Sequence, residues 1–317
     1  MIAYLIRRLP SVAFLLLATT VVAFALPRLA PGDPAAAVAG SDASPETLAQ
    51  IREQMGLDQP ILTQYLDWMG GVLTGDLGTS FTTNRPVSEL IAARLTSTIE
   101  LALVAGILMV AIGVLLGVAT ATTRRPLTRG LLDAVNSALL AAPPFLTGLL
   151  LILLLGIAVP ILPVSGEVSL AEDPIIGIQY LILPALALAL PQAAAIGRLV
   201  TASMIGTAAE DFVDLATAKG VPGSTIVRRH VLRNSMAPAL VTIGLRFGEL
   251  LAGAIVIEAI FARHGLGSLA VTSVQTRDYF VVQILIVGAV AVAVAMQVLT
   301  DLGVAALDPR IRLGAAS

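Results

Sequence analysis

Residues Leu101 to Thr123 read LALVAGILMVAIGVLLGVATATT and contain no charged side chain, although Glu100 and Arg124 stand directly at their two ends. An α-helix rises about 1.5 Å per residue, so about 20 apolar residues are needed to cross about 30 Å of hydrocarbon. The stretch is long enough and predicts a membrane-spanning helix. Four further uncharged stretches have comparable lengths: between Arg8 and Arg28, Asp133 and Glu167, Asp173 and Arg198, and Asp278 and Asp301.

A sixth apolar stretch runs from about Ala237 to Phe261 and carries Arg246, Glu249 and Glu258. We therefore expect an all-α membrane protein with six transmembrane helices. The composition agrees, because 57% of the residues are hydrophobic and only 13% are charged, about half the charge of an average soluble domain. A net charge of −2 gives no indication of nucleic acid as a partner, and the absence of cysteine excludes disulfides and thiolate metal sites.

The distribution of basic residues predicts the orientation in the membrane. With both termini in the cytoplasm, eleven basic residues fall on the cytoplasmic side and five on the outside. The cytoplasmic set is Arg7, Arg8, Arg124, Arg125, Arg129, Lys219, Arg228, Arg229, Arg233, Arg310 and Arg312; the outer set is Arg52, Arg85, Arg94, Arg263 and Arg277. The N-terminal stretch, which a signal peptide would resemble, is interpreted as the first membrane helix.

These expectations divide the chain into four parts: an N-terminal transmembrane helix (1–30), an external loop domain (31–97), a five-helix core (98–306) and a cytoplasmic tail (307–317). The external part contains an amphipathic stretch from Pro45 to Met55, preceded by Ser44 as an expected N-cap. Its simplest interpretation is a small packed cap over the outer mouth. The core contains a cytoplasmic loop, 206–236.

That loop reads as a helix, a sharp turn and a second helix. Phe212, Leu215 and Ala216 recur within one helical turn and form an apolar face. Gly220 is placed to end the first helix in a left-handed conformation, and Pro222 prevents its continuation. Ser224 is the expected N-cap of the second helix. Such a segment suits insertion into a groove of a partner, or it is an interfacial helix held to anionic lipid by Arg228, Arg229 and Arg233.

The loop resembles the EAA loop of binding-protein-dependent ABC permeases, whose pattern is Glu-Ala-Ala, three residues and Gly. Here it runs Asp214-Leu215-Ala216, three residues and Gly220. Ala216 to Gly220, Arg229 to Asn234 and Pro238 are similar to the dipeptide, oligopeptide and nickel branch. Further similar segments are Pro31 to Pro34, Gly56 to Asp58, Gln64-Tyr65, Gly75 to Ser80, Phe261 to Gly267, Arg277 to Tyr279 and Leu307 to Ile311. His264 and Phe280 depart from the family, which tends to have proline at both positions.

The resemblance implies the type I importer fold and an ATPase-coupling helix formed by Phe212, Asp214, Leu215, Ala216, Lys219 and Gly220. It further implies a second homologous permease subunit, two cytoplasmic ATP-binding-cassette subunits, an external substrate-binding protein, and a place in the bacterial plasma membrane. The implied cargo is a short peptide, with nickel or glutathione as the alternative.

ATP and Mg²⁺ are expected on the partner subunits, with no cofactor in this chain. Lys219 is the only lysine and follows Ala218, whereas a phosphate-binding loop needs Gly-Lys-Ser/Thr. The lack of a phosphate-binding loop would equally suit an ion-coupled secondary transporter. Such a transporter is expected to contain inverted repeats, and none is evident in the sequence. A membrane enzyme is the third alternative, but the two histidines lie in different loops.

The charges inside the sixth apolar stretch are candidates for the translocation path or its gate, since intramembrane charges are paired or functional. Arg246 and Glu249 are three residues apart and are expected to pair with each other or to contact substrate. Glu258 lies near the outer end of this apolar stretch and would face the gate or the outer aqueous phase. Gly113 and Gly117 predict a close helix contact.

Overall fold

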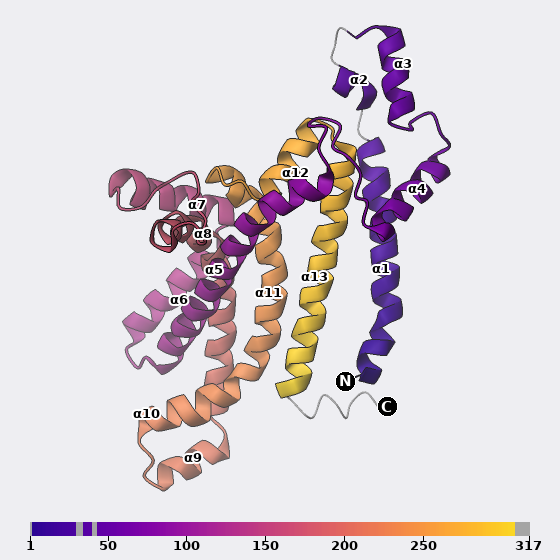
Figure 1. Cartoon of the computed structure of the whole chain (residues 1–317). Coiled ribbons are helices and arrows are strands. Elements are labelled where there is room, and N and C mark those ends of the chain that lie inside the picture. The colour runs from indigo at the N-terminus through magenta and orange to yellow at the C-terminus, as the bar shows by residue number, and fades with distance from the viewer. Residues whose placement is uncertain (1, 30–33, 40–42, 308–317) are drawn as a thin grey trace. The chain divides into compact units, whose positions relative to one another are not determined.

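The computed structural model describes residues 2–29, 34–39 and 43–307, and its regular elements within these ranges are all helices (Figure 1). The helices are α1 (Ile2–Leu29), α2 (Pro34–Ala39), α3 (Pro45–Gln54), α4 (Ile61–Thr74), α5 (Val87–Thr122), α6 (Pro126–Ala141), α7 (Pro144–Leu151), η1 (Ile152–Ala158), α8 (Pro174–Ala208), α9 (Asp211–Ala218), α10 (Gly223–Thr225), η2 (Ile226–Val231), α11 (Leu232–Ile260), α12 (Leu266–Gln275) and α13 (Tyr279–Leu307). Here η marks a π-helix. The similar segment Pro31-Gly32-Asp33 and the tail beyond Leu307 lie outside the described residues.

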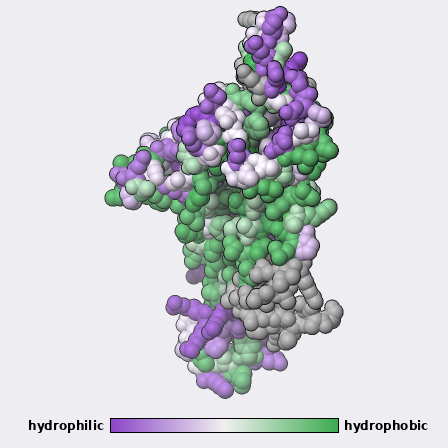
Figure 2. Space-filling view, turned by 45° about the vertical axis from the view of Figure 1, so that its right-hand side comes forward, coloured by the Kyte–Doolittle hydropathy of each residue, from purple (hydrophilic) through white to green (hydrophobic). Residues whose placement is uncertain are grey.

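Five described helices are long and apolar enough to cross a membrane: α1, α5, α8, α11 and α13. A sixth span results if α6 and the α7–η1 helix are counted together, but these two are bent by 111° at their junction. The all-α membrane fold is therefore confirmed, with five or six spans. The third predicted span is not one straight helix. On the face seen in Figure 2, hydrophobic residues cover the long helices, whereas hydrophilic residues gather around α3 and around the α9–α10 turn.

The break in the third span follows from Pro143-Pro144. A residue before proline is driven out of the α region, and both Ala142 (ψ 121°) and Pro143 (ψ 152°) are extended. Pro144 then starts α7 at a position where its missing N–H costs no hydrogen bond. Two consecutive extended residues interrupt the helix and change the direction of the chain. A single proline inside a helix would only kink it. The prolines of α8, Pro184 and Pro191, lie within a continuous helix.

The chain divides into two compact units, and the first contains Thr98–Arg263 with residues from Ala295 onward. Its core runs along α8, which packs on α6, α7 and α11. The predicted close contact of Gly113 and Gly117 is present: a Cβ atom at Gly113 would lie 2.9 Å from the Ala193 carbonyl oxygen, and one at Gly117 would lie 2.6 Å from Val200. Only glycine allows α5 to approach α8 this closely.

The second unit contains Ile2–Ser97 with His264–Val294. Its core includes Phe24 of α1, Trp68 of α4 and Val281 of α13. Two segments from the family resemblance meet here, because the Ser80 hydroxyl donates to Asp278 and a Cβ at Gly78 would lie 3.2 Å from the Phe280 ring. The large ring of Phe280 thus packs against a glycine.

Helix α3 begins as predicted. Ser44 is its N-cap, and the Ser44 hydroxyl accepts a hydrogen bond of 3.2 Å from the Thr47 N–H. The boundaries at residues 30, 97 and 306, and the role of the external part as a cap over the outer mouth, stay predictions.

Candidate functional site

Helix α9 ends in a tightly hydrogen-bonded turn. The Gly220 N–H donates to the Thr217 carbonyl at 2.9 Å, and the Val221 N–H donates to the Ala216 carbonyl at 3.1 Å. These two bonds form a Schellman motif. Gly220 has φ +77°, so the predicted left-handed end of the helix is confirmed. In Figure 1, α9 follows the end of α8, and the chain then returns through α10 toward α11.

The second helix of the loop starts earlier than predicted. It begins at Gly223 with Pro222 as the N-cap residue, so Ser224 lies inside the first turn and is not the cap. Pro222 instead accepts backbone hydrogen bonds from Thr225 and Ile226 at 2.9 and 3.0 Å. From Gly223 the helical residues continue through η2 into α11, so the turn after α9 is directly connected to a membrane span.

The two faces of α9 differ in burial. Val213 is buried, and Ala216 packs beside it against the core of the first unit. Phe212 and Leu215 are 39% and 56% exposed. The predicted apolar face is therefore divided, because Ala216 belongs to the inner face and the two larger side chains stand outward. Asp214, Lys219 and Gly220 are exposed as well.

Arg246 and Glu249 form the predicted pair on α11. The Arg246 Nη1 atom lies 2.6 Å from the Glu249 Oε2 atom and 3.4 Å from the Gln192 Oε1 atom. The side chains are 31% and 54% exposed, so the chain leaves this charged pair partly uncovered. A partly exposed ion pair on a membrane helix must face another protein surface or a water-filled path.

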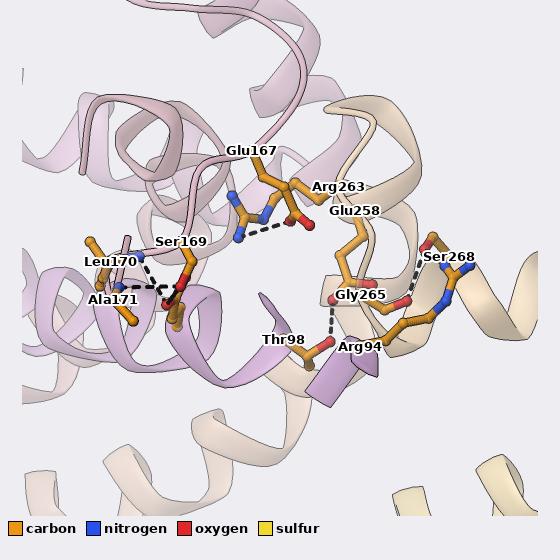
Figure 3. Close-up of polar contacts among 11 residues, drawn as sticks. Arg94, Thr98, Glu167, Ser169, Leu170, Ala171, Glu258, Arg263, Gly265 and Ser268 are labelled. Atoms are coloured by element: carbon orange, nitrogen blue, oxygen red, sulfur yellow. Dashed lines mark hydrogen bonds and ion pairs between the residues drawn. The ribbon is translucent and has the colours of Figure 1, made fainter. Parts of the chain in front are cut away.

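Glu258 does not face water. It is fully buried, and the Thr98 hydroxyl donates to its carboxylate at 2.6 Å (Figure 3). This corrects the expectation that it would face the outer aqueous phase. The reason is tertiary packing: α5 brings Thr98 against the Glu258 carboxylate, and just beyond the end of α11 the chain turns back so that the Arg263 N–H donates to the Glu258 carbonyl at 2.9 Å.

Arg263 is the centre of the surrounding polar cluster, although its spacing in the sequence gives no sign of this. Its side chain is 1% exposed, and its Nη2 atom lies 3.4 Å from the Glu167 carboxylate (Figure 3). Burial lowers the pKa of the Arg263 guanidinium, and the carboxylates of Glu167, Glu100 and Glu258 act in the opposite direction. The only available sequence signal is that Arg263 lies in the family-like segment Phe261 to Gly267.

Glu100, in the middle part of α5, connects this helix to the loop before α8. Its carboxylate accepts hydrogen bonds from the Ser169 hydroxyl at 2.7 Å and from the Leu170 N–H at 3.0 Å. The cluster thus links α5, the 159–173 loop and the end of α11 within the first unit, through the buried Arg263 and Glu258 and the partly buried Glu100 and Glu167.

The described residues form a bundle of apolar helices with an exposed helix-turn outside the spans, which is the architecture of a multi-pass membrane protein. Comparison with known proteins agrees with this class. Residues 113–313 match the family described as binding-protein-dependent transport system inner membrane component, and residues 1–102 match its N-terminal companion family. The chain belongs to this family, the permease subunits of ABC importers.

Curated relatives span the whole chain. The probable peptide ABC transporter permease protein y4tP of Sinorhizobium fredii is 35% identical, and the match covers 98% of this chain and 99% of that protein. The glutathione transport system permease protein GsiC of Salmonella typhimurium is 37% identical with the same coverage. Among solved structures, an inward-facing MetNI methionine ABC transporter aligns with a TM-score of 0.57 at 17% identity, over 69% of this chain and 96% of that chain. That likeness supports the type I importer permease fold.

Proposed function

We propose that the chain forms half of the translocation pathway of an ATP-driven importer for short peptides, and that α9 is the helix through which separate ATPase subunits drive it. The observation that carries this proposal is the outward position of Phe212 and Leu215 on a helix whose end is fixed by the Gly220 turn. Exposed large apolar residues on a rigid knob suit a groove on a partner.

The packing of α9 explains how a partner's movement would reach the membrane. Val213 and Ala216 join α9 to the same core as Ile226 of η2, and the Ser235 hydroxyl of α11 donates to Thr207 of α8 at 3.0 Å. A displacement of α9 is therefore passed to the ends of α8 and α11 as a rigid-body shift. An interfacial helix held only by lipid would have no need of this connection.

The cargo is proposed from the relatives. One is named a probable peptide permease and another a glutathione permease, and both match nearly the whole chain. Short peptides are the simplest class common to these names, since glutathione is a modified tripeptide. Arg246 and Glu249 suit a place along the path because they are partly uncovered, whereas the buried Glu258 suits a role in holding the outer end closed.

The proposed assembly contains a second homologous permease, two cytoplasmic ATP-binding-cassette subunits and an external substrate-binding protein. Both termini lie in the cytoplasm, in agreement with the eleven-to-five distribution of basic residues. ATP hydrolysis takes place on the partner subunits, because the only lysine of this chain lacks the surroundings of a phosphate-binding loop.

The test compares two glycines of one turn in the reconstituted complex. Gly220→Val places a β-branched residue at φ +77°, which is strained, whereas Gly223→Val serves as the control because Gly223 has no positive φ and open space around it. We expect Gly220→Val to reduce ATP-driven uptake of a labelled dipeptide and retention of the ATPase subunits, and Gly223→Val to preserve both. Normal uptake and retention with Gly220→Val would refute the coupling role.

A second variant tests the outward face itself. Leu215→Asp changes an exposed position and should leave the helix content of the chain unchanged. It should nevertheless prevent co-purification of the ATPase subunits, because a carboxylate would be buried without a partner in their groove. Co-purification at the wild-type level would show that Leu215 is not at the interface.

A further inference from the structure

The second unit contains a pocket of about 290 Å³ that no part of the transport mechanism uses. It lies between the end of α1, helix α4 and the glycine-rich turn after α4, and its lining includes Arg28, Gln64, Asp67, Trp68 and Asp76. Its volume is at the lower end of the range typical of small-molecule sites. An amino acid or a very short peptide is therefore of the right size.

Arg28 supplies a positive charge to this pocket. Its Nη1 group donates to the Phe24 carbonyl at 2.8 Å and its Nη2 group to the Gln64 Oε1 atom at 3.1 Å, while the guanidinium lies 3.5 Å from the centre of the Phe24 ring. The first bond holds the guanidinium against the last turns of α1. Within the described ranges of the chain, no carboxylate lies at ion-pair distance from Arg28. Two of five N–H donors have a protein acceptor there, so the fixed guanidinium retains donors for an anionic group.

Trp68 also lines the pocket and carries a buried hydrogen-bond donor. Its side chain is 7% exposed and packs against Phe24 and Tyr65, with ring centroids 5.8 and 6.2 Å apart. Its indole N–H is buried and has no acceptor among the residues that the structure describes. An unsatisfied buried donor is unfavourable, so an acceptor brought by a ligand would be stabilised there.

Two carboxylates complete the lining. Asp76 accepts a hydrogen bond from the Gly78 N–H at 3.0 Å through one oxygen, and Asp67 is an exposed residue of α4. With Arg28 on the same pocket, these groups offer complementary charges to a ligand that carries both a carboxylate and an ammonium group. A purely anionic ligand would be repelled by Asp67 and Asp76.

The faces of α4 distinguish a water-soluble ligand from a lipid. Leu62, Leu66 and Leu73 lie within about 40° of one another around the helix and are 68%, 57% and 80% exposed. Such a stripe suits contact with hydrocarbon. Gln64 and Asp67, which line the pocket, lie on the side of the helix about 150° away from the stripe. When the leucines rest against the apolar phase, the pocket therefore faces away from it.

We propose that this pocket binds a small water-soluble zwitterion, either a free amino acid or a short peptide. Arg28 and the Trp68 N–H hold its carboxylate, and Asp67 with Asp76 holds its ammonium group. The proposal rests on the chemistry of the pocket and does not depend on which cargo the importer carries.

The chain contains its own reporter, because Trp68 is its only tryptophan. The full chain is purified and placed in lipid nanodiscs without partner subunits, and intrinsic fluorescence is followed while alanyl-alanine is added. We expect a saturable change in the Trp68 emission with a dissociation constant on the order of 0.1–1 mM. N-acetyl-alanyl-alanine and alanyl-alanine amide, which lack the ammonium and the carboxylate respectively, should each bind at least about tenfold more weakly.

Variants locate the response. Arg28→Gln should weaken binding by about 10- to 100-fold, Arg28→Lys should weaken it less, and Asp67→Asn should weaken binding of alanyl-alanine but not of its N-acetyl form. Arg85→Gln is the matched control, because Arg85 lies in the same unit, pairs with Glu89 on the surface and does not line the pocket. Helix content measured by circular dichroism shows whether each variant is folded.

Three outcomes would overturn the proposal. The first is no saturable change with alanyl-alanine in the folded wild-type chain. The second is a response that Arg28→Gln and Arg28→Lys leave unchanged. The third is equal binding of inorganic phosphate, or competition by added phosphatidylethanolamine, which would assign the pocket to an anion or a lipid headgroup. None of these measurements involves ATP or uptake, so failure here is distinguishable from failure of the proposed transport function.

Discussion

Replacement of Arg263 by methionine tests the polar cluster at the end of α11. The Arg263 side chain is 1% exposed and pairs with Glu167 at 3.4 Å, so its removal leaves buried carboxylate charge without its cation. Breaking a buried ion pair costs about 3–5 kcal/mol. Because Glu167 is 23% exposed and can partly recover its hydration, we expect the lower end of this range, about 3 kcal/mol.

The assay is unfolding of the purified chain in detergent, with circular dichroism as the readout and a denaturing detergent as the titrant. Arg85→Met is the matched control: Arg85 forms an ion pair with Glu89 at 3.3 Å, but both side chains are 57% exposed. Exposed pairs contribute about 0–1 kcal/mol. Adding Glu167→Gln to Arg263→Met should recover part of the loss, because the unpaired carboxylate is then removed. An Arg263→Met loss no larger than that of Arg85→Met would refute the reasoning.

Three further predictions concern local packing and helix ends. Gly106→Ala should destabilise the chain by about 1–3 kcal/mol, because the added Cβ would lie 2.2 Å from the Phe247 Cζ atom; Phe247→Leu should restore part of that loss in the same unfolding assay, and an additive double variant would contradict the contact. Ala262→Gly should stabilise by about 0.5–1 kcal/mol, since Ala262, two residues beyond the end of α11, has φ 50°; a lower unfolding midpoint would contradict it. Ser44→Ala should increase hydrogen exchange in α3 alone, as expected for a lost N-cap, and an unchanged exchange rate in α3 would show that the cap is not needed.

Glu46 adds a pH dependence to the same helix. Hydrogen bonds from its own backbone N–H and from Ser44 lower its pKa, so its contribution to the start of α3 is complete above its ordinary pKa. That contribution should disappear as the pH falls through the lowered value. Exchange in α3 that is equally protected in Glu46→Gln and in wild type at neutral pH would contradict this.

The helical membrane fold could be predicted from the sequence because each membrane helix is determined by residues that are close together in the chain. The length of each uncharged stretch is set by the thickness of hydrocarbon, and the end of α9 at Gly220 is set by backbone conformation within five residues. The start of α10 was predicted two residues late. Its N-cap is Pro222, whose carbonyl accepts the first backbone hydrogen bonds of the helix, and the Ser224 side chain is not needed as a cap. The third apolar stretch is bent by 111° between α6 and α7, because the adjacent Pro143 and Pro144 leave two consecutive extended residues in it, and the length of an uncharged stretch does not report such a bend.

The amino-acid sequence by itself determined the class of the protein, since apolar length, the N-cap at Ser44 and the left-handed turn at Gly220 depend on neighbours in the chain. The tertiary structure alone decided the surroundings of the charged side chains. Arg263 meets Glu167, Thr98 meets Glu258 across 160 residues, and Arg28 meets Gln64 across 36. No spacing rule encodes such pairs, because they depend on which helices pack together. For the same reason, α9 looks uniformly apolar on one side in the sequence, and only packing separates the partly buried Ala216 from the exposed Phe212 and Leu215.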